Sequence, residues 1–268
     1  MDCFTLMENN IFDFNHDLVF SLNGVFFSMK PVKGGTFWMG AQNTDPAGRN
    51  YDKDAQKEEC DVHQCTVSDF YMGETLVTQA LWKLFDKYWG TGFGEKGDNY
   101  PIFDVSWSEA RSFIRRLNDA LKDQRCEFKF RLPKEAEWEF AARGGMKSHG
   151  YKYAGGDDID EVGWYENGDW MHPVKGKKPN ELGLYDMSGN VWEWCEDVFW
   201  TVRKGEKVQP KQAKPGVLFR VRRGGSFNSP PVSCRVSSRM GFHPGHKTYG
   251  IGFRLLLYKP FTSSNFAP

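Results

Sequence analysis

The stretch from Gly183 to Trp194, GLYDMSGNVWEW, holds residues whose types and spacing could do chemistry. Asp186 and Glu193 lie on either side of a Ser-Gly-Asn turn, whose glycine and asparagine tolerate positive φ. Calcium takes several oxygens at once, from carboxylates and from the backbone carbonyls of tight turns. The stretch therefore predicts either a cation site at this turn or a plain turn with solvated acids and core tryptophans.

The chain has six cysteines and no Cys-x-x-Cys pair, so we expect no zinc knuckle. Cys60 and Cys65 are close enough in sequence to pair in an oxidising compartment. The first 20 residues carry acids and lack a basic segment followed by an apolar run, so they predict no signal peptide. We therefore expect cytoplasmic synthesis and reduced thiols, with display at a surface or on a phage particle left open.

Composition narrows the class of protein. Lys and Arg together number 35, as do Asp and Glu, which argues against a general nucleic-acid binder. No stretch of 18 apolar residues is present, so we expect no membrane span. Aromatic residues make up 16% of the chain, enough to stiffen a core and to line a binding surface.

Several elements must position these residues. Partial alternation over residues 11–30, with Asn-Gly at its centre, predicts a β-hairpin, and polar residues 41–61 predict a surface loop. Apolar spacing and capping residues predict three helices, over residues 78–88 with Thr78 as N-cap, from Ser106 or Ser108 to Leu121, and over residues 133–142, before Gly144.

The chain changes character after residue 145. Gly, Pro and Asn become frequent, which predicts short strands, many loops and little helix. Residues 199–217 predict a surface excursion, and residues 221–223 and 250–258 predict strands. Because no linker or repeat interrupts the pattern, we expect a single domain.

Nine motifs occur in one order along the chain: VKGGTFWMG from residue 32, FYMGE from 70, PIFDVSW from 101, FRLPKEAEWEFAARGG from 130, HPV from 172, PNELGLY from 179, RGGSF from 223, CRVSSR from 234 and IGFR from 251. Over residues 26 to 258 the sequence thereby resembles the formylglycine-generating enzyme family, also called the sulfatase-modifying-factor domain. The resemblance implies an α+β domain over residues 26–260, with residues 1–25 as an N-terminal arm or edge strand. Its fold would be a variant of the C-type lectin-like fold, with a twisted antiparallel sheet, two main helices and much irregular chain.

The resemblance also implies where copper chemistry would lie. Enzymes of this family oxidise a cysteine with copper(I) and dioxygen, and they use two cysteines five residues apart after the Gly-Gly-Ser element. Here Cys234 fills the second position, but Ser229 stands at the first. A hydroxyl is a poor ligand for the soft copper(I) ion, so copper is not expected and Cys234 would be a catalytic residue only in an unfamiliar oxidase.

For calcium the resemblance agrees with the residues. The family's turn supplies side chains at the positions of Asp186 and Glu193 and backbone carbonyls at those of Gly189 and Val191. We therefore predict a structural calcium ion at this turn.

A branch of the family, the variable proteins of diversity-generating retroelements, uses the C-terminal part of the fold as a mutable binding face. The corresponding section here is residues 223–254, between RGGS and IGFR. Its candidate ligand-binding residues offer rings, amides, hydroxyls and cations, and they are Phe227, Asn228, Ser229, Phe242, His243, His246, Lys247, Thr248 and Tyr249.

The sequence thus predicts a non-catalytic protein that binds a protein or another macromolecular ligand through residues 227–249. The alternatives are a metal-dependent thiol oxidase that uses Cys234, and a regulatory subunit of an active homologue. The oligomeric state is not predicted.

Overall fold

The computed structural model describes residues 4–6, 13–87, 96–122, 127–166, 170–203, 206–208 and 216–260. Its strands are β1 (Phe4–Leu6), β2 (Leu18–Leu22), β3 (Val25–Val32), β4 (Gly35–Met39), β5 (His63–Val67), β6 (Phe70–Gly73), β7 (Lys129–Arg131), β8 (Gly163–Trp164), β9 (Ser188–Gly189), β10 (Trp192–Val198), β11 (Thr201–Arg203), β12 (Glu206–Val208), β13 (Arg220–Arg223), β14 (Arg239–Phe242), β15 (Ile251–Gly252) and β16 (Leu256–Tyr258).

The α-helices are α1 (Gln79–Lys83), α2 (Trp107–Leu121), α3 (Glu135–Ala142) and α4 (Ile159–Val162). Thr78 caps α1 and Ser106 caps α2, as predicted, because each hydroxyl accepts a backbone N–H of the first turn. The predicted helix over 78–88 is shorter, since regular helix ends at Lys83, and Tyr88 lies outside the described residues. Gly144 adopts a φ of 89° just after α3, where a left-handed residue ends a helix.

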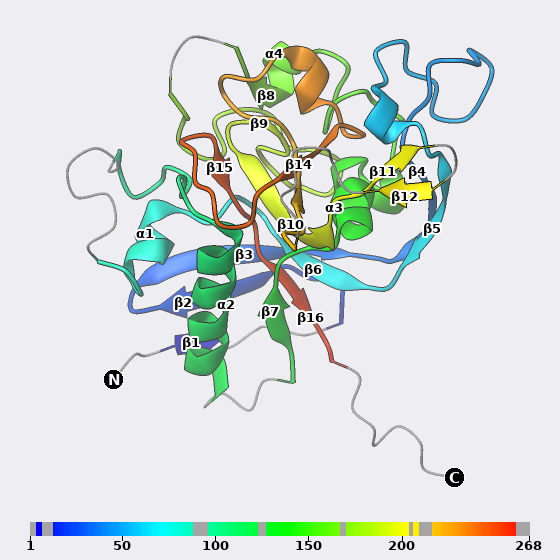
Figure 1. Cartoon of the computed structure of the whole chain (residues 1–268). Helices are drawn as coiled ribbons and strands as arrows, with labels where there is room; N and C mark the ends of the chain where they lie inside the picture. Colours follow the sequence, from blue (N-terminus) through cyan, green and yellow to red (C-terminus); the bar gives the residue numbers. More distant parts are fainter. Residues whose placement is uncertain are drawn as a thin grey trace.

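A six-stranded antiparallel sheet with the order β1-β2-β3-β6-β16-β7 forms the base of the molecule (Figure 1). The predicted hairpin is confirmed: β2 and β3 pair around a turn in which Asn23 and Gly24 have φ of 49° and 83°. β1 is an edge strand on β2. Because β2 lies inside this sheet, residues 18–25 pack as one unit with the domain that follows.

Helix α2 covers this sheet (Figure 1). Its buried side chains Phe113 and Leu117 belong to the same apolar cluster as Phe20 and Phe130 of the strands. Burying each such side chain contributes about 1.5–3 kcal/mol to stability. The 3.6-residue spacing that predicted the helix is thus the spacing of its core contacts.

A second sheet has the order β14-β13-β10-β15 and carries the C-terminal motifs. In it β15 runs parallel to β10, so the fold's sheets are not wholly antiparallel. The predicted strand over 250–258 is two strands, because the chain leaves this sheet after Gly252 and enters the large sheet at Leu256. Between them Arg254 turns into the interior and is fully buried.

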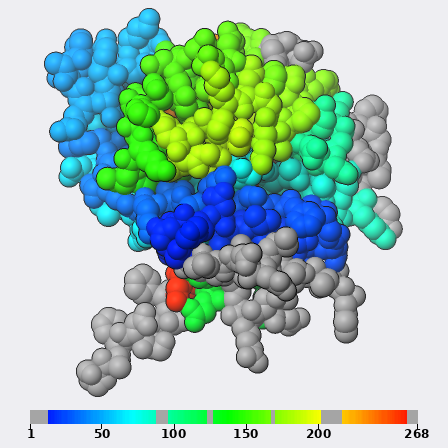
Figure 2. Space-filling model, turned by 180° about the vertical axis from the view of Figure 1, so that it is seen from behind, coloured from blue at the N-terminus to red at the C-terminus, as the bar shows by residue number. Residues whose placement is uncertain are grey.

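The two sides of the molecule carry different parts of the chain. The connection between β14 and β15 lies on the viewer's side in Figure 1. From behind, the surface consists mainly of the N-terminal strands and, above them, the central part of the chain (Figure 2). No helix among the described residues is long and apolar enough to cross a membrane.

Candidate ligand-binding face

The connection between β14 and β15, residues 243–250, is fixed on the start of α2. The Trp107 backbone N–H donates to the Pro244 carbonyl at 3.0 Å, and the Lys247 ammonium pairs with Glu109. Glu109 also completes the capping box of α2 with Ser106. Glu109, in the first turn of α2, therefore also helps to hold residues 243–250, a segment in which binding residues were predicted.

One end of this segment carries a group of aromatic rings. Tyr249 is 53% exposed and Trp170 is 46% exposed, and their ring centres lie 5.5 Å apart in an edge-to-face arrangement. Trp170 also stacks toward Phe227, at 6.2 Å between ring centres, and Tyr249 toward Phe103, at 6.1 Å. The Lys96 ammonium lies 4.6 Å from the centre of the Trp170 ring. Large rings held on a buried base are typical of binding surfaces.

The other end carries a second group. His243 and His246 stack with ring centres 4.0 Å apart, and Phe242 lies 6.0 Å from His246. On the interior side of this group, the centre of the Phe242 ring lies 6.0 Å from that of the buried Trp194 ring. We call the exposed and half-buried rings Trp170, Phe242, His243, His246 and Tyr249, together with the exposed Lys247 between the two groups in sequence, the candidate face.

The structure separates the predicted residues by burial. Asn228 and Lys247 are exposed and Thr248 is half-buried, whereas Phe227 and Ser229 are 6% and 7% exposed. Phe227 packs in a small apolar cluster, so its side chain supports Trp170 and is not itself on the surface. Trp170 was missed, because it lies far from residues 227–249 in sequence and only the fold brings it beside them.

Positions 229 and 234, where the family places its copper ligands, do lie together. The Ser226 backbone N–H donates to Ser229 Oγ at 3.1 Å, and it also faces the Cys234 thiol, whose pKa it lowers slightly. Burial outweighs that effect and raises the pKa of Cys234 to about 12, so the thiol stays protonated at neutral pH. Gly225 is required here, because a Cβ atom at its φ of 73° would lie 2.5 Å from Cys234 Sγ.

The residues predicted to hold calcium lie in one buried turn. Gly189 and Asn190 have φ of 85° and 61°, as expected for the turn. Glu193, however, accepts two hydrogen bonds from Arg254, at 2.8 and 2.9 Å, and a third from the Trp138 indole at 2.9 Å. The Arg254 guanidinium thus already neutralises this carboxylate.

Asp186, the other predicted ligand, is held separately. Its oxygens accept hydrogen bonds from the Lys175 backbone N–H and the Asn190 amide, at 2.9 and 3.2 Å. Burial raises the pKa of Asp186. A cation shared by Asp186 and Glu193, with the backbone at Gly189 and Val191, does not fit this arrangement while Arg254 is in place, and among the described residues no three His, Cys, Asp or Glu side chains gather as metal ligands. Calcium stays a prediction.

Three arginines of the recognised motifs are fully buried and paired with carboxylates. Arg223 contacts Glu135 and Glu139, Arg235 contacts Asp52 and Glu59, and Arg254 contacts Glu193. These pairs join segments far apart in sequence across the irregular half of the fold. In these three motifs the arginine therefore has a structural role.

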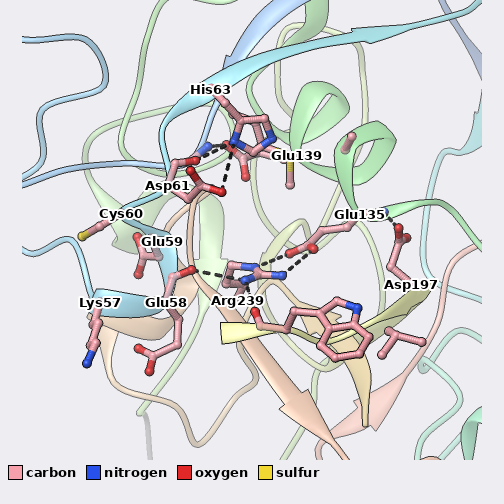
Figure 3. Close-up of a pocket in the computed structure, with 15 residues that line it drawn as sticks. Lys57, Glu58, Glu59, Cys60, Asp61, His63, Glu135, Glu139, Asp197 and Arg239 are labelled. Carbon is pink, nitrogen blue, oxygen red and sulfur yellow. Dashed lines mark hydrogen bonds and ion pairs between the residues drawn. The ribbon is translucent and has the colours of Figure 1, made fainter. Parts of the chain in front are cut away.

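A separate cavity of about 500 Å³ opens at the opposite end of β14 (Figure 3). Arg239 crosses it and binds both oxygens of Glu135, at 2.6 and 2.7 Å. Asp197 accepts the Glu135 backbone N–H. Cys60, at its edge, has a pKa raised by burial, and neither it nor Cys65 forms a disulfide. The buried carboxylates that line this cavity, Glu59, Glu135 and Glu139, are thus all paired with arginines, and no activated nucleophile lines it among the described residues.

Known proteins resemble this chain over most of its length. A formylglycine-generating enzyme of Streptomyces coelicolor is 28% identical over an alignment of 305 residues, which covers 88% of this chain and 91% of that enzyme. The chaperone protein LppX of Paenibacillus barcinonensis is 36% identical over 219 residues, covering 64% of this chain and 74% of that protein. The solved structure of Treponema denticola variable protein 1 matches with a TM-score of 0.73 and 27% identity, covering 91% of this chain and 99% of that one.

The domain architecture follows from these comparisons and from the sheets described above. The sulfatase-modifying factor enzyme 1-like domain matches residues 27–259, nearly the whole described chain. The match with the Treponema protein extends across both sheets, because it covers 91% of the chain. The chain therefore belongs to the family of sulfatase-modifying factor enzyme 1-like domains and has the C-type lectin-like fold of the formylglycine-generating enzymes.

Proposed function

We propose that this chain is a non-catalytic binding protein whose candidate face recognises a macromolecular ligand, and that this face is diversified as in the retroelement variable proteins. The observation that carries the proposal is the pair of half-exposed rings, Trp170 and Tyr249, that stands on the buried Phe103 and Phe227. Rigid aromatic side chains lose little entropy when a partner covers them, so they serve well as binding anchors.

The state of the copper positions supports a role without catalysis. Ser229 Oγ is buried and shares a hydrogen bond of 2.9 Å with Ser226 Oγ, so it is already engaged. The Cys234 thiol, with a pKa of about 12, is a protonated group in apolar surroundings. Copper(I) requires thiolate or thioether ligands, and this pair offers neither in ready form.

A face-specific binding experiment tests the proposal. The purified domain is immobilised and exposed to protein extracts of the cells that carry the gene and of their neighbours, and retained proteins are identified by mass spectrometry. We expect a defined partner to be retained by the wild type and lost with Trp170→Ala and with Tyr249→Ala. Phe26→Ala is the matched control, because Phe26 is a 62% exposed ring on the large sheet. Retention that survives both face variants would contradict the proposal.

The two alternative functions have their own tests. A thiol oxidase would consume oxygen with copper(I) and a thiol peptide, and Cys234→Ala would abolish that consumption. A regulatory subunit would co-purify with a homologue that carries both copper-site cysteines. The similarity to the Streptomyces enzyme motivates both tests, because it covers 88% of the chain.

A further inference from the structure

Arg222 lies beside Phe242 of the candidate face. It belongs to β13, where it pairs with Trp194 of β10 on one side and Met240 of β14 on the other. Its guanidinium carbon lies 4.6 Å from the centre of the Trp192 ring and 4.5 Å from that of the Phe242 ring. Two rings at this distance stabilise a cation in place.

Phe242 places Arg222 at the histidine end of the face, and the backbone of Trp192 adjoins the other end. Phe242 belongs to the histidine group described above. The Trp192 backbone N–H donates to the Gly250 carbonyl at 2.7 Å, directly after Tyr249 in the chain. A ligand that covers Phe242 and the histidine group would therefore also reach Arg222.

Arg222 is half-buried, and unlike the fully buried arginines it has no carboxylate partner among the described residues. Arg223, Arg235 and Arg254 all contact carboxylates, whereas the hydrogen-bond partner of Arg222 is the Met240 thioether, 2.9 Å from Nη2. Its Nε is buried and has no acceptor in the part of the chain that the structure describes.

The electrostatics of Arg222 agree with this geometry. Burial lowers the pKa of its guanidinium to about 10, which still leaves the side chain charged at neutral pH. A partly desolvated cation without an acid is unfavourable for the isolated fold, and such groups are typical of binding and catalytic sites.

Met240 is suited to give way to a stronger acceptor. Its side chain is 41% exposed, unbranched and flexible, and a thioether accepts hydrogen bonds only weakly. The donors Nη2 and Nε lie on one edge of the guanidinium plane, and that edge matches the two oxygens of a carboxylate.

We propose that an acidic side chain of the bound protein replaces the Met240 thioether on Arg222, so that the candidate face recognises a protein segment that contains Asp or Glu. This inference rests on the proposed function, because it concerns the same face. It names the ligand's chemistry: a carboxylate that lies flat between aromatic contacts.

Nitrogen NMR of the arginine side chains tests the inference on the full chain. Two capped tripeptides, Gly-Glu-Gly and Gly-Gln-Gly, serve as probes, and the Nε–Hε signal of Arg222 is assigned by its loss in Arg222→Lys. We expect a saturable shift of that signal with the glutamate peptide and none with the glutamine peptide. The signals of Arg223 and Arg254, which are already paired with Glu139 and Glu193, are the internal controls and should not move.

Met240→Ala supplies a second readout that does not remove the proposed anchor. Because this change removes the thioether from Nη2, it should tighten binding of the glutamate peptide severalfold. An Arg222 signal that follows ionic strength alone, or that responds to inorganic phosphate and sulfate but not to the peptide, would overturn the inference. So would equal affinity of the wild type and Met240→Ala.

The two proposals can fail separately. Loss of a partner from Trp170→Ala and Tyr249→Ala without any peptide effect at Arg222 would leave the binding face standing and remove the carboxylate. A peptide response at Arg222, together with partner retention that the ring variants do not change, would support the carboxylate contact and contradict the proposed binding face.

Discussion

At the scale of single residues, the exchange of a cysteine for Ser229 has the largest chemical consequence. Position 229 still lies beside Cys234, since both face the Ser226 backbone amide. What has changed is the ligand chemistry, because a hydrogen-bonded hydroxyl and a protonated thiol replace two soft thiolates. The side chains at positions 229 and 234 thus lie beside the same backbone amide.

The state of Cys234 can be measured by alkylation. In the folded protein at about pH 8, we expect iodoacetamide to modify the exposed Cys60 and to spare Cys234, because a thiol of pKa about 12 is almost wholly protonated and here also buried. Peptide mapping by mass spectrometry gives the rate at each cysteine. Cys234 should react only after unfolding in denaturant, and equal rates for both thiols in the native protein would contradict the structure.

At the scale of elements, side-chain hydrogen bonds fix the irregular chain where a metal was expected to. The turn between Asp186 and Glu193 is tied to the preceding segment through Asn190, which exchanges hydrogen bonds with the His172 backbone. Arg254 ties the same turn to the Gly73 and Tyr185 carbonyls. One arginine therefore joins both sheets and the central turn.

A chelator separates this arrangement from a calcium site. If the Arg254 guanidinium alone neutralises Glu193, EDTA should leave the Tm unchanged. A ligand that binds only the folded state stabilises it, so a bound structural calcium would make EDTA lower the Tm. Such a drop, with one calcium per chain by elemental analysis, would confirm the calcium prediction and require Arg254 to move.

Removing Arg254 tests its structural role. Arg254→Met should lower the free energy of unfolding by about 3–5 kcal/mol, because it leaves Glu193 buried without a partner. Denaturant titration measures the change. The matched control is the double variant Arg254→Met with Glu193→Gln, which removes the orphaned charge and should recover part of the loss. A loss below about 1 kcal/mol, the usual value for exposed pairs, would contradict the role.

At the scale of the whole molecule, buried carboxyl groups have opposite effects on the stability of the fold at acidic pH. Burial alone would raise the pKa values of Glu135 and Glu139, but nearby arginines outweigh burial and hold both below the usual 4.5. Their contribution to stability is present above pH 4.5 and is lost as the pH falls through their lowered pKa values. Burial instead raises the pKa values of Asp186 and Asp197, so folding gains from their protonation as the pH falls.

The pH profile of the Tm should show both effects. On acidification from neutral pH we expect a flat or slightly rising Tm, followed by a steep fall below about pH 4.5. Asp197→Asn should flatten the rise, because it removes one carboxyl group whose pKa is raised, and it should leave the steep fall in place. A Tm that falls steadily from neutral pH would contradict these pKa directions.

Local signals in the sequence predicted local structure well. The Asn-Gly turn, the Thr78 and Ser106 caps and the glycine after α3 each act within one turn of chain, so their neighbours in sequence suffice. The parallel pairing of β10 with β15 depends on residues far apart, and no local pattern encodes it. Composition also could not show that Phe227 points inward, nor that Trp170 stands beside Tyr249.

The candidate site shows the same limit. The prediction for residues 227–249 included the exposed Asn228 and Lys247. It missed Arg222, which lies one residue before the section 223–254, in a segment that was predicted only as a strand. Arg222 has no carboxylate partner among the described residues, whereas the buried Arg223, Arg235 and Arg254 each have one, and that difference is a property of three-dimensional packing.

The central claim is that this face is a diversified binding surface, and sequencing the 3′ end of the gene with its flanking DNA from many clones of one population tests it most directly. We predict substitutions at the codons of exposed residues such as Asn228, His246 and Tyr249, matched to a nearby template repeat at adenines, with the buried Arg223 and Ile251 unchanged. An invariant section without a nearby template, or substitutions spread equally over buried and exposed positions, would contradict it.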